Sequence, residues 1–164
     1  MEVKQFVETI FIKEIGRLQK EEFFLFSFIL IGQGIESLGA IIDTKPLKAK
    51  AQSRKRFDDA IYKLFPREYQ KLNLKGMLYD QLRSALTHLF IPGGFLTLAT
   101  KADKDLGDKH LQIVNGATVI VAENLYSDFV YACNRLFDGI EKGKVKRTKL
   151  NVDLPEGQLF AKLF

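Results

Sequence analysis

The chain reads FFLFSFILI from Phe23 to Ile31, and this run is its longest apolar stretch, interrupted only by Ser27. Glycines and a glutamate follow directly, so the run is shorter than the roughly 20 apolar residues that span a bilayer. It therefore predicts the buried core helix of a globular protein, extending from about Glu21 to Ile42. Glycines at positions 32, 34 and 39 would let a neighbouring helix approach its backbone closely.

Four further helices are predicted around this one, because apolar residues recur at intervals of three and four. Ser53 is predicted to cap the N-terminus of one of them, and Pro66 ends it. Cys133 lies in the apolar stripe of another helix and is predicted to be a packed thiol. The four helices are expected over residues 2–20, 53–65, 72–90 and 122–142.

The periodicity changes from helical to alternating after Pro92-Gly93-Gly94. The next segments are strand-like at residues 95–100, 111–114 and 117–121. Asn115-Gly116, between the last two, is the strongest short signal for a hairpin. An inserted antiparallel hairpin or meander is therefore expected at about residues 95–121, with residues 101–110 as a solvated turn.

Together these segments predict a mainly α-helical fold, an up-and-down bundle of about five helices with the β insertion. Residues 1–143 are expected to form one domain, since a chain of 164 residues with ordinary apolar content suits a single core. Residues 144–164 form a C-terminal extension that is basic first and apolar afterwards. Its apolar side chains are expected to dock on the domain or on a second copy of the chain, and they are Leu159, Phe160, Leu163 and Phe164.

The sequence gives little support for metal, cofactor or membrane chemistry. Its two histidines are far apart, its single cysteine cannot form an internal disulfide, and it has no zinc-binding or phosphate-loop motif. The chain opens with Met1-Glu2-Val3-Lys4, without the basic-then-apolar order of a secretory signal. We therefore expect a cytoplasmic protein that uses no metal and no cofactor and does not span a membrane.

Positive charge is concentrated in two parts of the sequence. The net charge is +5, but residues 44–89 hold eleven basic and four acidic residues, and residues 144–164 hold five and two. Such clusters suit a polyanion, because neutralising phosphates releases counterions. The alternative is a solvated basic face that serves solubility alone. The cations expected to contact nucleic acid are Lys48, Lys50, Arg54, Lys55, Arg56, Lys144, Lys146 and Arg147.

One predicted helix brings an arginine close to a histidine in sequence. Arg83 and His88 lie five residues apart, shortly before Pro92. Histidine changes protonation near neutral pH and the planar guanidinium fits phosphate, so the pair could perform acid–base chemistry on a phosphodiester. On a regular helix they lie roughly 140° apart. They could converge if the helix loosens near Pro92, or if two copies of the helix meet across a symmetric interface. The alternative is structural: His88 favours the negative end of the helix, and Arg83 lies over the ring of Tyr79.

The spacing of Arg83 and His88, late on a helix of a small helical bundle, resembles the Arg-x(4 to 6)-His signature of the HEPN superfamily, the higher eukaryotes and prokaryotes nucleotide-binding domains. The resemblance implies a metal-independent endoribonuclease of a toxin or defence system. His88 would then be the general acid or base, and Arg83 would bind the phosphate. Ser84 and Phe90 depart from the family pattern, in which Asn, Asp or His commonly follows the arginine and some toxins have a modified tyrosine after the histidine.

Three functions follow from these alternatives. The chain is expected to be an RNA-directed endoribonuclease, a non-catalytic binder of nucleic acid, or a dimeric interaction and regulatory module. The partners that these functions imply are RNA, a second copy of the chain in a homodimer, and an antitoxin protein.

Overall fold

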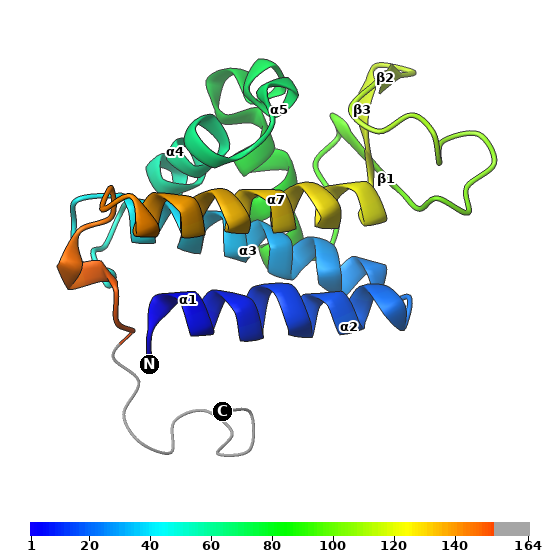
Figure 1. The fold of residues 1–164 in the computed structure, drawn as a ribbon. Helices are drawn as coiled ribbons and strands as arrows, with labels where there is room; N and C mark the ends of the chain where they lie inside the picture. Colours follow the sequence, from blue (N-terminus) through cyan, green and yellow to red (C-terminus); the bar gives the residue numbers. More distant parts are fainter. Residues whose placement is uncertain (153–164) are drawn as a thin grey trace.

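The computed structural model describes residues 1–152 and shows a mainly helical protein with one small sheet (Figure 1). The mainly helical prediction is confirmed, whereas the apolar part of the C-terminal extension lies outside the described residues. The helices before the sheet are α1 (Val3–Phe6), η1 (Val7–Glu14), α2 (Ile15–Lys20), α3 (Phe24–Ile42), α4 (Ser53–Leu64), α5 (Arg67–Leu72), η2 (Leu74–Gly76), η3 (Tyr79–Ser84) and α6 (Ala85–Leu89). The strands are β1 (Leu96–Ala99), β2 (Ile113–Val114) and β3 (Ala117–Val121), and the last helices are α7 (Ala122–Glu141) and η4 (Arg147–Lys149).

The first three elements form one continuous rod whose middle part, η1, is a π-helix. Its buried residues follow one another at intervals of four, and they are Val3, Val7, Phe11 and Ile15. In a regular α-helix this spacing drifts around the axis, because one turn takes about 3.6 residues. The wider π turn compensates for the drift and keeps the four side chains on the face that meets α3 and α7.

The apolar helix α3 lies in the core of the molecule, as its sequence predicts. It packs against α2, α4, α7 and η3, and ten of its residues are buried. Gly39 is necessary for this packing, because a Cβ there would overlap the backbone of Arg56 in α4. Among residues 1–152, α3 is the one helix long and apolar enough to cross a membrane, but more than half of its apolar window is buried against protein.

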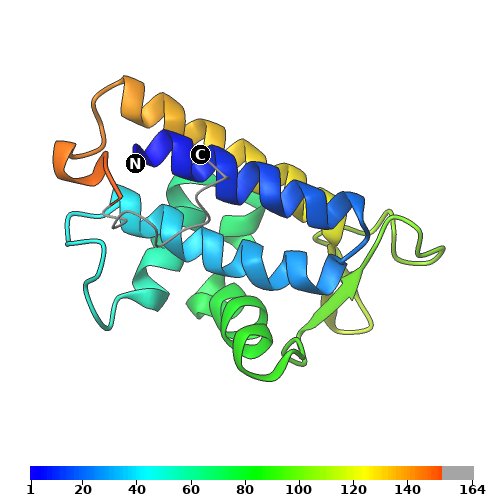
Figure 2. The same cartoon turned by 90° about the horizontal axis from the view of Figure 1, so that it is seen from below.

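The long helices do not alternate in direction throughout the bundle. The rod from α1 to α2 runs antiparallel to α3, but α7 runs in the same direction as α3 (Figure 1 and Figure 2). The position of the sheet explains this difference. It returns the chain to the end of the bundle where α3 begins, and α7 starts there directly after β3. A strict up-and-down arrangement is therefore not what the structure shows.

The sheet is mixed rather than antiparallel, with the strand order β1-β3-β2. β1 pairs with β3 in parallel, whereas β2 pairs with β3 antiparallel across the Asn115–Gly116 turn. β3 takes the central place because Val119, Ile120 and Val121 are all buried, as a strand covered on both sides requires. The expectation of an antiparallel meander is wrong for β1, because the chain after β1 crosses to the far side of β3 before it forms β2.

The helix predicted over residues 72–90 is broken near its start. Asn73 is buried, and its side chain accepts a hydrogen bond from Leu78 N at 3.0 Å and donates one to Asp58 at 2.7 Å. Lys75 and Gly76 both have positive φ, a conformation in which a right-handed helix cannot continue. The chain turns here, and a new helical segment that contains η3 and α6 follows.

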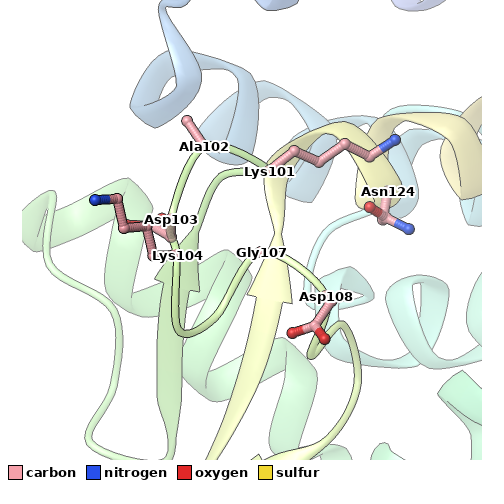
Figure 3. Close-up of a pocket in the computed structure, with 7 residues that line it drawn as sticks. All are labelled: Lys101, Ala102, Asp103, Lys104, Gly107, Asp108 and Asn124. Carbon is pink, nitrogen blue, oxygen red and sulfur yellow. The ribbon is translucent and has the colours of Figure 1, made fainter.

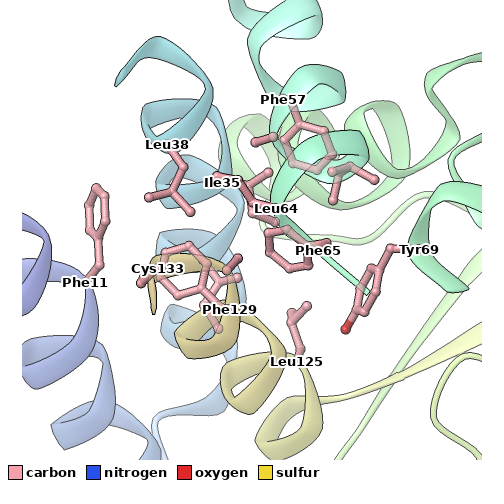
Figure 4. Close-up of a cluster of buried hydrophobic side chains, with 14 of the residues drawn as sticks. Phe11, Ile35, Leu38, Phe57, Leu64, Phe65, Tyr69, Leu125, Phe129 and Cys133 are labelled. Atoms are coloured by element: carbon pink, nitrogen blue, oxygen red, sulfur yellow. The ribbon is translucent and has the colours of Figure 1, made fainter. Parts of the chain in front are cut away.

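Aromatic side chains form one part of the core, and among the described residues five phenylalanines and Tyr69 are buried. Figure 4 shows Phe129 of α7 between Phe11 and Phe65, and the ring centres are 5.7 and 6.5 Å from that of Phe129. Cys133 lies one turn further along α7 and is fully buried. Burial raises the pKa of its thiol to about 12. The cysteine is a packed, protonated thiol, as expected.

Candidate functional site

The Arg83 side chain lies between η3 and α3. Its guanidinium binds the Glu36 carboxylate at 2.7 Å and donates a hydrogen bond to Gln33 Oε1 at 3.3 Å. Both side chains of the ion pair are largely buried, with 15% and 19% of their surface exposed. The guanidinium also lies over the ring of Tyr79, 5.6 Å from its centre, as the structural alternative for Arg83 predicts.

Further hydrogen bonds extend this contact along the two helices. Gln33 Nε2 donates to Thr87 Oγ1 at 2.6 Å, and Thr87 donates in turn to the Arg83 carbonyl at 2.7 Å. The backbone and stem of Arg83 pack against Gly32 of α3. Arg83 therefore joins η3 to α3, and its positive charge is already neutralised by Glu36.

His88 lies in the last turn of α6 with its ring exposed. Its neighbour Thr87 faces α3, so His88 points about 100° away from that contact around the helix. Phe90 then ends the helix with left-handed backbone geometry. The structure thus leaves His88 in solvent at a helix C-terminus and holds Arg83 against α3, so one chain does not unite the two groups around a substrate.

Among the cations predicted to bind nucleic acid, Arg56 is buried and does not face solvent. It binds Asp43 at 2.7 Å and donates hydrogen bonds to the carbonyls of Leu47 and Pro46. Lys149 is also buried and binds the other Asp43 oxygen at 2.8 Å. Burial alone would raise the pKa of Asp43, but the hydrogen bonds from Lys149 and Arg56 bring it below its ordinary value. Arg56 therefore belongs to a structural charge cluster, which corrects its sequence-based assignment.

Arg54 and Lys55 are exposed, but each has an acidic partner on the protein. Arg54 binds Asp80 and lies 4.9 Å from the ring centre of Tyr79, and Lys55 binds Asp59 at 2.5 Å. Exposed pairs of this kind are weak and can exchange partners with a polyanion. The other predicted cations are exposed and form no ion pair with the residues that the structure describes, and they are Lys48, Lys50, Lys144, Lys146 and Arg147.

The loop after α3 and the described residues after α7 each begin one of the basic segments, and they lie at the same end of the bundle (Figure 1). The loop after α3, together with η4 and the residues that follow it, lines one hollow of about 720 Å³, which includes Lys45 and Lys48. A smaller hollow of about 130 Å³ contains Lys45 and Lys63, and a third of about 430 Å³ contains Lys63 and Lys144. Because neighbouring hollows share lysines, they form one continuous track.

We call this region the basic end. Three carboxylates also line the track, Asp43, Asp59 and Asp138, but cations outnumber them. Because the hollows adjoin one another along the track, the region offers a surface for an extended ligand. Its exposed cations are Lys45, Lys48, Lys50, Lys55, Lys63, Arg135, Lys142, Lys144, Lys146 and Arg147.

The opposite end of the molecule has a different chemistry. The connector after β1 and the start of α7 line a hollow of about 540 Å³ (Figure 3), which has two lysines, two aspartates and Asn124 on its wall. Asp103 closes its own turn by accepting a hydrogen bond from Thr100 N at 2.7 Å. Within residues 1–152, no group of three or more His, Cys, Asp or Glu side chains is placed to hold a metal ion. The balanced charges of this hollow give no preference for an anion.

One polar cluster was not predictable from sequence motifs. Tyr69 donates to Asp128 Oδ2 at 2.8 Å, and His110 Nε2 lies 3.0 Å from the tyrosine oxygen and 3.3 Å from the same carboxylate oxygen. His110 Nδ1 accepts the backbone N–H of Val121 at 3.0 Å. Burial, followed by the charge of Asp128, raises the pKa of Tyr69 well above its ordinary value. Since both histidine nitrogens already form hydrogen bonds, we interpret the cluster as structural. It holds the connector that contains His110 against α5 and α7.

No protein-family model, no curated protein and no solved structure matches this chain. The resemblance to the HEPN superfamily therefore depends on the spacing of Arg83 and His88 alone. The geometry of the described residues is the remaining basis for a functional proposal.

Proposed function

We propose that this chain is a cytoplasmic RNA-binding protein that holds the sugar–phosphate backbone along its basic end without cleaving it. One observation carries the proposal: two basic segments from distant parts of the sequence converge on one continuous track. An extended chain of phosphates can contact several of these cations at once. Such multiple contacts, with their release of counterions, supply most of the sequence-independent affinity for nucleic acid.

Lysines predominate on this track, and they determine the expected mode of binding. A lysine ammonium is a compact point charge that suits a phosphate oxygen, and contacts to phosphate position a strand without identifying its bases. We therefore expect the affinity to depend on the length and charge of the RNA, and only slightly on its sequence.

Cleavage is not part of the proposal, because the arginine that would hold the scissile phosphate is engaged. Arg83 binds Glu36 and is mostly buried, while His88 is exposed on another side of the helix. General acid–base catalysis needs its groups within hydrogen-bond reach of one phosphodiester. The single chain does not provide that arrangement.

Fluorescence anisotropy with a labelled single-stranded RNA tests the proposal with two matched double variants. Lys48→Gln/Lys144→Gln removes one cation from each basic segment, and Lys101→Gln/Lys104→Gln removes the same charge from the opposite end. The logarithm of the binding constant falls linearly with the logarithm of the salt concentration, and each lost phosphate contact makes this slope shallower by about 0.7. The first variant should therefore have a slope shallower by about 1.4 and bind about tenfold more weakly at low salt. The second should bind like the wild type. Equal losses in both variants, or salt-independent binding, would overturn the proposal.

The same mixtures separate binding from cleavage when they are kept in EDTA and analysed on a denaturing gel. We expect the RNA to remain intact with the wild-type protein and with His88→Ala. Metal-independent cleavage that both His88→Ala and Arg83→Ala abolish would establish an endoribonuclease in place of a binding protein.

A further inference from the structure

Large apolar side chains are exposed on the first half of α3, at the end of α6 and on the loop between α6 and β1. The helices α3 and η3–α6 lie side by side in this region (Figure 2). They run in opposite directions, because Glu36 contacts Arg83 while Gln33 contacts Thr87. The same register brings the first half of α3 beside the loop that leaves α6. Seven large apolar side chains in these neighbouring segments are 42% to 68% exposed. We call them the apolar surface, and they are Phe23, Phe26, Leu30, Leu89, Phe90, Ile91 and Phe95.

Part of the apolar surface is one side of α3. Phe23, Phe26 and Leu30 are spaced by three and four residues, so they share a side of the helix. The opposite side holds Phe28 and Ile31, which are buried in the core. The helix is thus apolar on both sides, and the residues that the structure describes leave one of them uncovered.

The loop that supplies the rest of the apolar surface is fixed by hydrogen bonds. Gly93 N donates to the Gln81 carbonyl at 3.0 Å, and Phe95 N donates to Gln81 Oε1 at 3.1 Å. A Cβ on Gly93 would overlap the Gln81 side chain. Phe90 has φ of 58°, an unfavourable conformation for an aromatic residue. These contacts fix the backbone of the loop while its apolar side chains remain exposed. The exposure of these side chains is therefore a property of the folded structure.

The apolar surface is large enough for a stable protein contact. An aromatic side chain has roughly 150–250 Å² of surface, so seven large side chains at these exposures present on the order of 700 Å². The largest apolar patch of a typical monomer is about 300–600 Å², and a standard interface buries about 800 Å² on each partner. The apolar surface exceeds the first range and approaches the second value.

We propose that a second copy of this chain covers the apolar surface and forms a symmetric dimer. A two-fold contact places the same surface on both sides, and an apolar surface is complementary to itself. The basic end, which would repel a second copy, lies at the far end of α3 (Figure 1). Glu21 and Glu22 directly precede Phe23, and their charge disfavours an anionic lipid surface as the occupant. Both basic ends of the dimer remain open to RNA.

Sedimentation velocity of the full chain at micromolar concentration tests the dimer with matched variants. Leu89 and Leu74 are both 68% exposed, but Leu74 lies outside the apolar surface. We expect the wild type and Leu74→Glu to sediment as dimers. Leu89→Glu should weaken the dimer roughly 100-fold, as the loss of an interface anchor does, with an unchanged circular dichroism spectrum. Leu30→Glu repeats the test from α3, so the result does not depend on the folding of the loop.

Several outcomes would overturn the proposal. One is a monomeric wild-type protein, and another is a dimer that Leu89→Glu and Leu30→Glu leave intact. Dimerisation only after removal of residues 153–164 would show that this segment covers the apolar surface. Binding of a monomeric wild type to neutral phospholipid vesicles, lost in Leu89→Glu, would assign the surface to a membrane. The RNA-binding measurement uses other residues, so either proposal can fail without the other.

Discussion

Arg83 shows how burial decides what a charged residue can do. Its guanidinium contacts a carboxylate, an amide and an aromatic ring, and all three belong to the contact between neighbouring helices. Arg83 Nε is buried and has no hydrogen-bond partner among the described residues. The arginine is stabilised in this position only while Glu36 is present, because a buried charge without its partner is strongly unfavourable.

Removing one member of the Arg83–Glu36 pair should therefore destabilise the protein. We expect Glu36→Gln and Arg83→Ala each to lower the free energy of unfolding by about 2–3 kcal/mol, because each leaves a largely buried charged group without its ion-pair partner. Urea denaturation measures this change. Arg67→Ala removes an exposed cation and should change stability by less than about 0.5 kcal/mol. Losses no larger than that of Arg67→Ala would contradict the structural role of the pair.

The packing of the helices depends on two glycines in opposite ways. Gly39 and Gly139 both lie inside long helices. A Cβ on Gly39 would overlap the backbone of Arg56 in α4, whereas a Cβ on Gly139 would meet no atom within 4 Å. Glycine is thus required at the first position and only weakens the helix at the second.

The two alanine variants should therefore shift stability in opposite directions. Gly39→Ala should push α4 away from α3 and lower the free energy of unfolding by about 2–3 kcal/mol, as overpacking of a core does. Gly139→Ala should raise it by about 0.5–1 kcal/mol, because alanine is the better helix former. Chemical denaturation followed by circular dichroism compares them. A shift in the same direction for both would show that the close approach of α3 and α4 is not the cause.

Elements with a regular apolar repeat could be predicted from the sequence. The helices expected over residues 53–65 and 122–142 correspond to Ser53–Leu64 and Ala122–Glu141. The break after α5 was not predictable, because it depends on a hydrogen bond between Asn73 and Asp58 of another helix. The parallel pairing of β1 with β3 was missed for the same reason: a local repeat does not specify which strand takes the centre of a sheet.

At the scale of the whole molecule, the candidate site could be predicted only in part. The two basic segments are visible as charge clusters in the sequence. Their convergence requires the loop after α3 and the residues after α7 to lie at the same end, and this follows from α3 and α7 running in the same direction. The burial of Arg56 also depends on a distant residue, Lys149, which binds the same Asp43. Such relations are set by the complete fold, and no single stretch of sequence contains them.

Because Asp43 binds both Arg56 and Lys149, lowering the pH should reduce the stability of the protein. The pKa of Asp43 is below its ordinary value in the folded protein, so its contribution to stability is complete above the unfolded value of about 3.9 and is lost as the pH falls further. Asp43→Asn leaves two buried cations without their carboxylate and should cost about 3–5 kcal/mol at neutral pH. Urea denaturation at several pH values should show this difference from the wild type shrinking below about pH 4. Asp105→Asn, an exposed control on the connector, should match the wild type throughout. If the difference in the free energy of unfolding between wild type and Asp43→Asn stays constant with pH, the charge of Asp43 does not hold the end of α3, α4 and η4 together.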